Sequence, residues 1–218
     1  MGAFTSHATP PSELSDEIYR VLQVCELYYN DGRYQEAQDR GQKVLAKYPN
    51  RGFAKLIIKP TLAKYHLAMG DFVGFNKTLD SYLKDTKEQR GGDSQAYGLA
   101  LLDAAKLYLQ HGNLVKVQEY LDMAEKILTS ESKDWKYKHL YVETKLAFQL
   151  GNYDEAVEDM PELLRAYEFL LQPMQKRFNQ MTNEFETFEA TDIQLRQAAN
   201  EYGHLLNLSA DIARRKGD

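Results

Sequence analysis

Apolar residues recur every three or four positions along most of this chain, which is the spacing of one face of an α-helix. The first such run contains Ile18, Leu22, Cys25 and Tyr29. Each of the early runs ends at a short polar turn that contains a glycine. The pattern therefore predicts a succession of helices joined by tight turns.

The turn glycines are spaced at similar intervals. They are Gly32, Gly70, Gly112, Gly151 and Gly217, and the steps between them, by subtraction, are 38, 42, 39 and 66 residues. A helical pattern that repeats every ~34 to 47 residues is typical of a helix-turn-helix repeat protein. Glycine suits these turns because a helix commonly ends in a left-handed residue. We expect the Asn or Asp beside it to cap the next helix.

The pattern predicts ten helices in antiparallel pairs. The first runs from Ser12 to the Gly32 turn, and the others cover residues 34–47, 52–69, 72–85, 96–110, 114–128, 135–150, 153–171, 174–189 and 192–216. We expect Pro60 to delay or kink the third helix and Pro161 to bend the eighth. A Met and Phe stripe at helical spacing favours the helix at residues 174–189.

These elements form one domain. Residues 1–11 are polar and rich in Pro, and we expect a flexible leader there. Residues 12–218 then form a single helical-repeat domain, with units at about 12–50, 52–90, 96–132 and 135–171 and extra C-terminal helices at 174–218. Gly217-Asp218 repeats the pattern with which earlier units begin a helix, so we expect the chain to be a fragment of a longer protein.

Tyr28, Ala37 and Pro49 occupy three fixed positions of the tetratricopeptide repeat pattern, W-x2-L-G-x2-Y followed by A-x3-F and P. Phe75 departs from it, because the pattern has Ala at that position. The chain resembles the tetratricopeptide repeat superfamily, with degenerate repeats of about 38–42 residues over residues 18–171. The resemblance implies an all-α fold, an α-solenoid of antiparallel helix pairs that winds into a right-handed superhelix.

Composition narrows the function. Hydrophobic residues make up 43% of the chain, and the formal net charge of −5 gives no basic excess for nucleic acid. No run approaches the ~18 apolar residues of a membrane-spanning helix. A single cysteine excludes an internal disulfide and favours a reducing, cytoplasmic location. Gly2 with Ser6 fits an N-myristoylation pattern, and whether Gly2 is acylated stays open.

Catalytic chemistry finds little support in the sequence. The five histidines fall in different predicted elements and include no i, i+4 pair for a metal. Cys25 occupies a small-residue position where helices approach closely, which favours a buried, inert thiol. We predict that the protein is not an enzyme and uses no cofactor or metal.

Binding is the better-supported class, because a helical solenoid presents a long concave surface. In proteins that resemble tetratricopeptide arrays, the first helix of each pair lines that groove. The resemblance assigns to the groove Tyr19, Leu22, Glu26, Tyr29, Lys64, Leu67, Lys106, Leu109, Gln110, Tyr141, Lys145, Phe148 and Gln149. Lys64, Lys106 and Lys145 share one register position and form a predicted ladder of positive charge.

The expected partner is therefore a peptide or helix of another protein with acidic and apolar character, held by an adaptor or scaffold. Two alternatives remain open. One is a sensor or regulatory module of a larger signalling protein whose output domain is missing here. The other is an architectural subunit of a multiprotein assembly. We also expect homo- or hetero-oligomers to form through the C-terminal helices.

Overall fold

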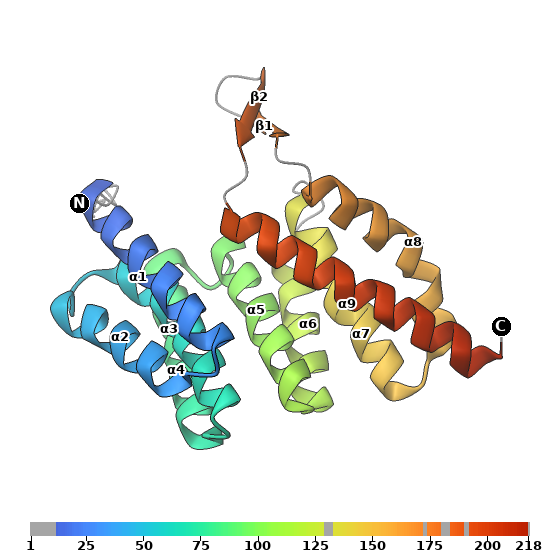
Figure 1. Ribbon diagram of the computed structural model, residues 1–218, viewed down its shortest axis with the longest axis horizontal. Coiled ribbons are helices and arrows are strands. Elements are labelled where there is room, and N and C mark those ends of the chain that lie inside the picture. The colour runs from blue at the N-terminus through green and yellow to red at the C-terminus, as the bar shows by residue number, and fades with distance from the viewer. Residues whose placement is uncertain (1–11, 129–132, 172–173, 180–183, 190–191, 218) are drawn as a thin grey trace. The chain divides into compact units, whose positions relative to one another are not determined.

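The computed structural model describes residues 12–128, 133–171, 174–179, 184–189 and 192–217 (Figure 1). These residues form nine helices and one hairpin: α1 (Ser12–Asn30), α2 (Tyr34–Lys47), α3 (Gly52–Ala68), α4 (Phe72–Arg90), α5 (Gln95–His111), α6 (Leu114–Ile127), α7 (Lys133–Leu150), α8 (Tyr153–Leu170), β1 (Met174–Asn179), β2 (Glu184–Glu189) and α9 (Asp192–Lys216). They divide into two compact units, Met1–Leu107 and Tyr108–Asp218, and the division falls within α5.

Unit 1 is built from helix pairs. α1 packs against α2, α3 packs against α4, and α2 joins the two pairs by packing against α3 (Figure 1). Its core includes the fully buried Cys25 and Ala37, and Ile58 and Leu62 come from the next pair. Gly41 lets α2 approach α3 closely, since a Cβ atom there would lie 2.9 Å from Leu62 Cδ2.

Unit 2 continues the same arrangement. α6 packs against α7, α7 against α8, and α8 against α9 (Figure 1). The long helix α9 buries Ala198, Leu205, Leu208 and Ile212 on one face. That spacing of four to seven residues is the apolar stripe that the sequence predicts for this helix.

The four helix-to-helix turns share one backbone geometry. In the first, the Gly32 N–H donates to the Tyr29 carbonyl (3.0 Å) and the Arg33 N–H donates to the Tyr28 carbonyl (2.8 Å). These two bonds form a Schellman motif, which satisfies carbonyls at the helix end. The same pair of bonds recurs at the other three turns, and all five predicted turn glycines have φ between +73° and +84°. The predicted role of glycine in these turns is confirmed.

The predicted capping is confirmed at two turns. The Asp71 carboxylate accepts from the Gly74 N–H at 2.9 Å, and the Asn113 side chain accepts from the Lys116 N–H at 3.2 Å. The first turn differs, because Arg33 occupies the cap position of α2 and its side chain makes no capping hydrogen bond.

The predicted late start of α3 is wrong. α3 begins at Gly52 and runs through Pro60, and α8 runs through Pro161. A proline inside a helix costs about 3 kcal/mol. The buried side chains of Ile58 and Leu62 flank Pro60 and hold the helix against its neighbours, so tertiary packing outweighs that cost.

The predicted helix at residues 174–189 is also wrong, because β1 and β2 form an antiparallel hairpin there. Phe178 lies opposite Phe185 in its register, and Lys176 lies opposite Thr187. The Met and Phe spacing fits a helix, but Glu184–Glu189 reads EFETFE, in which polar residues and β-favouring residues largely alternate. Alternation with a period of two was the stronger signal.

Candidate functional site

Unit 1 brings six of the predicted partner-binding residues onto neighbouring helices. Tyr19, Leu22, Glu26 and Tyr29 come from α1, and Lys64 and Leu67 come from α3. The Lys64 ammonium lies 3.2 Å from each carboxylate oxygen of Glu26. It also lies 3.8 Å from the centre of the Tyr29 ring, in a cation–π contact. We call these six residues the α1–α3 face.

Each side chain of the α1–α3 face has a different share of the packing. Tyr19 is 50% exposed, whereas Leu22, Glu26, Lys64 and Leu67 are half-buried. The Tyr29 ring rests 5.5 Å from the ring of Tyr65, which is fully buried. Burial raises the pKa of Tyr29. The face is therefore an aromatic and aliphatic surface fixed to the core of unit 1.

The charge of Lys64 is balanced within this face. Its salt bridge with Glu26 is about one-third exposed on both partners, so it is partly screened by solvent. Lys106 is half-buried on α5 in the same unit, and Lys145 lies in unit 2. The structure therefore describes the three lysines of the predicted ladder in two separate groups.

Unit 2 treats the remaining predicted residues differently. Leu109 and Tyr141 are each only 4% exposed, so they contribute to packing and offer little area to a partner. Gln110 and Gln149 are exposed. The Lys145 ammonium donates to the Tyr141 hydroxyl at 3.3 Å and lies 5.2 Å from the centre of that ring.

Helix α9 accounts for part of this difference, because it covers side chains of α7 and α8. The Arg215 guanidinium lies 5.4 Å from the Phe148 ring centre and donates to the Tyr153 hydroxyl at 2.9 Å. Burial raises the pKa of Tyr141, and the nearby Glu201 carboxylate of α9 adds to the effect. The sequence register of α7 could not show that a later helix of the same chain occupies this surface.

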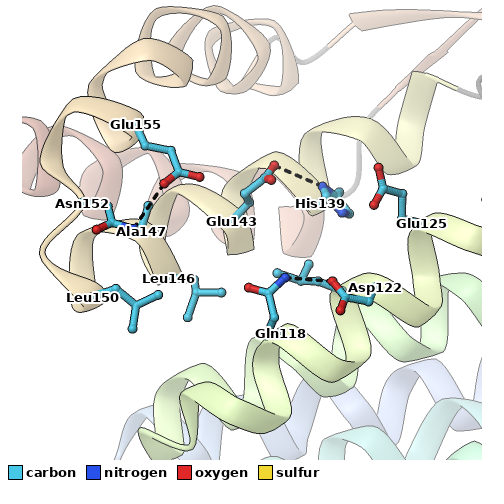
Figure 2. Close-up of a pocket in the computed structure, with 11 residues that line it drawn as sticks. Gln118, Asp122, Glu125, His139, Glu143, Leu146, Ala147, Leu150, Asn152 and Glu155 are labelled. Carbon is cyan, nitrogen blue, oxygen red and sulfur yellow. Dashed lines mark hydrogen bonds and ion pairs between the residues drawn. The ribbon is translucent and has the colours of Figure 1, made fainter.

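A small acidic cleft opens between α6, α7 and the start of α8 (Figure 2). Its volume is about 150 Å³, the space of roughly five water molecules. It is lined by Gln118, Leu121, Asp122, Glu125, His139, Glu143, Leu146, Ala147, Leu150, Asn152 and Glu155. Pockets that bind cofactors or drug-sized ligands usually have about 300 to 1,000 Å³. This cleft holds at most a single side chain or a few waters.

The charges of the cleft are largely engaged with one another. The Glu143 carboxylate lies 3.4 Å from His139 Nδ1, and this hydrogen bond lowers the pKa of Glu143 (Figure 2). Nearby Asp159 has a raised pKa, first because it is partly buried and then because four glutamates surround it. The described residues contain no group of three or more His, Cys, Asp or Glu side chains arranged to hold a metal ion.

Comparisons with known proteins address the fold. No protein-family model and no curated protein matches the sequence. The crystal structure of a putative kinesin light chain from Podosopora anserina, described as having nearly identical TPR-like repeats, is similar to this chain with a TM-score of 0.53. The two are 16% identical over 93% of this chain and 97% of that chain. The chain has a tetratricopeptide-like repeat fold.

The tetratricopeptide-like fold explains where the matching residues lie. The three positions that match the pattern outright fall on the first helix, the second helix and the exit of the first pair: Tyr28 on α1, Ala37 on α2, and Pro49 just after α2. Ala37 is fully buried, as a position of close helix approach requires. Phe75 is fully buried at the equivalent position of the second pair, so a large side chain fills the place of a small one.

Proteins with a tetratricopeptide-like fold are in general non-catalytic interaction scaffolds. The chemistry of Cys25 is in keeping with that. Its thiol is fully buried and donates to the Ala37 carbonyl at 3.4 Å. Burial raises the pKa of Cys25, which keeps the thiol in its unreactive protonated form. Within the described residues, no helix is long and apolar enough to cross a membrane.

Proposed function

We propose that this protein is an interaction scaffold and that the α1–α3 face binds a segment of a partner protein. The observation that carries the proposal is the meeting of Tyr29, Lys64 and Glu26 beside the half-exposed Tyr19. Tyrosines anchored on a rigid core offer large contact area at little cost in conformational entropy. The predicted α7 residues are weaker candidates, because α9 covers part of their surface.

The chemistry of the face favours a partner segment that is mainly apolar. Exposed ion pairs contribute about 0 to 1 kcal/mol each, so Tyr19, Leu22 and Leu67 have to provide most of the affinity. An acidic residue in the partner would compete with Glu26 for Lys64. Charge would then set the orientation and association rate of the partner more than its affinity.

The experiment compares two double variants in affinity capture, followed by calorimetry with the purified partner. Tyr19→Glu with Leu22→Glu places two negative charges on the α1–α3 face. Val73→Glu with Val115→Glu adds the same charge at valines that are 80% and 78% exposed elsewhere. We expect the first pair to abolish binding of a partner that the second pair still binds. Equal binding by both variants would refute the proposal.

A charge exchange tests the role of the salt bridge. Glu26→Lys with Lys64→Glu preserves an ion pair but reverses its direction on the face. If a partner carboxylate competes for Lys64, the exchange lowers its affinity while folding stays intact. If affinity is unchanged at low salt, the pair serves packing alone and the partner has no acidic residue at this position.

The sensor-module and architectural-subunit alternatives, the cytoplasmic location and the oligomer through C-terminal helices all stay predictions from the sequence. Leu206 on α9 is 46% exposed and is the residue at which the oligomer prediction is most readily tested. A Leu206→Glu change would separate an oligomer formed by α9 from one formed elsewhere, by light scattering after size exclusion.

A further inference from the structure

His66 lies in the last turn of α3, within a chain of hydrogen bonds that links three elements of unit 1. Its Nδ1 atom is 2.7 Å from the Asp71 carboxylate in the α3–α4 turn. On the other side, the Gln38 side-chain nitrogen of α2 lies 2.8 Å from His66 Nε2 and 3.1 Å from Nδ1. Gln35, one turn earlier on α2, continues the chain.

The two ends of this chain fix the direction of every bond. Gln35 Nε2 donates to the Asp39 carboxylate (2.9 Å) and to Gln38 Oε1 (3.1 Å). Because a carboxylate only accepts, the nitrogen of Gln35 must face Asp39, and the oxygen of Gln38 must then face Gln35. The nitrogen of Gln38 is left to donate to His66.

Asp71 fixes the other end. Its carboxylate also accepts from the Gly74 backbone N–H, and these two hydrogen bonds lower the pKa of Asp71. The ionised carboxylate takes a proton from His66 Nδ1–H, so His66 Nε2 carries the lone pair that accepts from Gln38. Neutral His66 with its proton on Nδ1 satisfies the whole chain.

Protonation of His66 disrupts this order. A second proton on Nε2 faces the Gln38 amide nitrogen, which is also a donor, at 2.8 Å. The Gln38 amide must turn over to present its oxygen, and its nitrogen then faces the donating nitrogen of Gln35. The conflict moves along α2 until Gln35 turns as well and leaves Asp39.

We propose that His66 is a proton-operated switch at the joint between the first two helix pairs. Neutral His66 couples α2 to the α3–α4 turn through Gln38, and charged His66 reverses the hydrogen-bond chain. Both switching side chains are shielded from water, since the Gln38 residue is 5% exposed and the His66 side chain is 13% exposed. Bulk water therefore cannot easily supply replacement partners.

The other titratable groups around the joint leave His66 as its switching element. Asp71 comes from the α3–α4 turn and Asp39 from α2. α1 contributes Tyr29 and Glu26, and Glu26 is paired with Lys64 of α3. α4 contributes the backbone of Gly74, and a side chain there would exclude the network, since a Cβ atom would lie 2.3 Å from His66 Nδ1. Histidine is the side chain whose charge ordinarily changes between pH 5 and 8.

Nuclear magnetic resonance of the full chain tests the proposal. Long-range ¹H–¹⁵N spectra at pH 8 should show His66 with its proton on Nδ1, whereas free histidine favours Nε2. As the pH falls to 5, the side-chain amide signals of Gln38 and Gln35 should shift with the same midpoint as the His66 ring. A proton on Nε2 at pH 8, or amide signals that do not follow His66, would overturn the proposal.

A Gln38→Glu variant provides the second measurement. The new carboxylate accepts from charged His66, so His66 should hold its proton to a pH higher by about one unit. The Gln35 amide signal should no longer move with the ring, because the carboxylate has no amide to turn over. His204, exposed on α9, should titrate identically in both proteins. An unshifted His66 midpoint in the variant would also contradict the proposal, and the wild-type spectra decide the matter if the variant does not fold.

Discussion

Phe75 is the residue whose removal should weaken unit 1 most clearly. It is fully buried on α4, at a position where the tetratricopeptide pattern has Ala. Phe75→Ala removes a whole aromatic side chain and leaves a cavity, which typically costs about 3 to 5 kcal/mol. Since domains of this size are usually stable by about 5 to 15 kcal/mol, the loss takes a large share of the total.

Phe72→Ala is the matched control, because Phe72 lies one turn earlier on the same helix and is 50% exposed. We expect it to cost about 1 kcal/mol or less, as most exposed substitutions do. The assay is urea unfolding followed by circular dichroism, with unchanged slopes as the test that both variants compare the same states. The only tryptophan, Trp135, lies in unit 2, so its fluorescence reports whether that unit unfolds with unit 1 or separately. Equal losses in the two variants would refute the packing of α4 described above.

Three further predictions follow from local contacts. Gly74→Ala should lower the melting temperature, because a Cβ atom would lie 2.2 Å from the Asp71 carboxylate, whereas Gly203→Ala has open space and should stabilise α9 by up to about 1 kcal/mol. Cys25 should resist a thiol reagent such as Ellman's reagent in the folded protein and react fully in urea; rapid reaction without urea would contradict its burial. Burial raises the pKa of Tyr65 and of Tyr82, so the unfolded chain ionises first and stability should fall as the pH rises above about 10. Ultraviolet difference spectra should show these two tyrosines ionising only on unfolding, and early ionisation would be the contrary result.

The helix pairs and their turns could be predicted because their causes are local. Gly32 needs only the chain around it to adopt a left-handed conformation, and Asp71 caps a helix three residues away. The start of α3 was harder, since Pro60 opposes the helix locally and the buried residues on both sides of it decide the outcome. The hairpin was missed because two periodicities overlap in the segment that contains Phe185.

The site was only partly predictable, for reasons that lie beyond the repeat register. Register placed Lys64 and Tyr29 on neighbouring first helices, and the structure brings them into contact. It gave no sign that Arg215 would lie over Phe148, because that contact joins residues 67 positions apart by subtraction. The right-handed superhelical arc is an arrangement of both units together and stays a prediction.

The network at His66 was also missed, since the five histidines were judged by metal spacing alone. A sequence signal for it does exist. His66 stands five residues before Asp71, and Gly74 follows the capping aspartate by three, where the missing side chain leaves room for an imidazole. The part played by Gln38 depends on how α2 packs against α3, and local sequence carries no sign of it.

Hydrogen–deuterium exchange of the full chain with a purified partner tests the central claim most directly. The account predicts slowed exchange in α1 around Tyr19–Tyr29 and in α3 around Lys64–Leu67, with little change in α7 beneath α9. Protection confined to α7, α9 or the hairpin, with α1 and α3 unchanged, would contradict it.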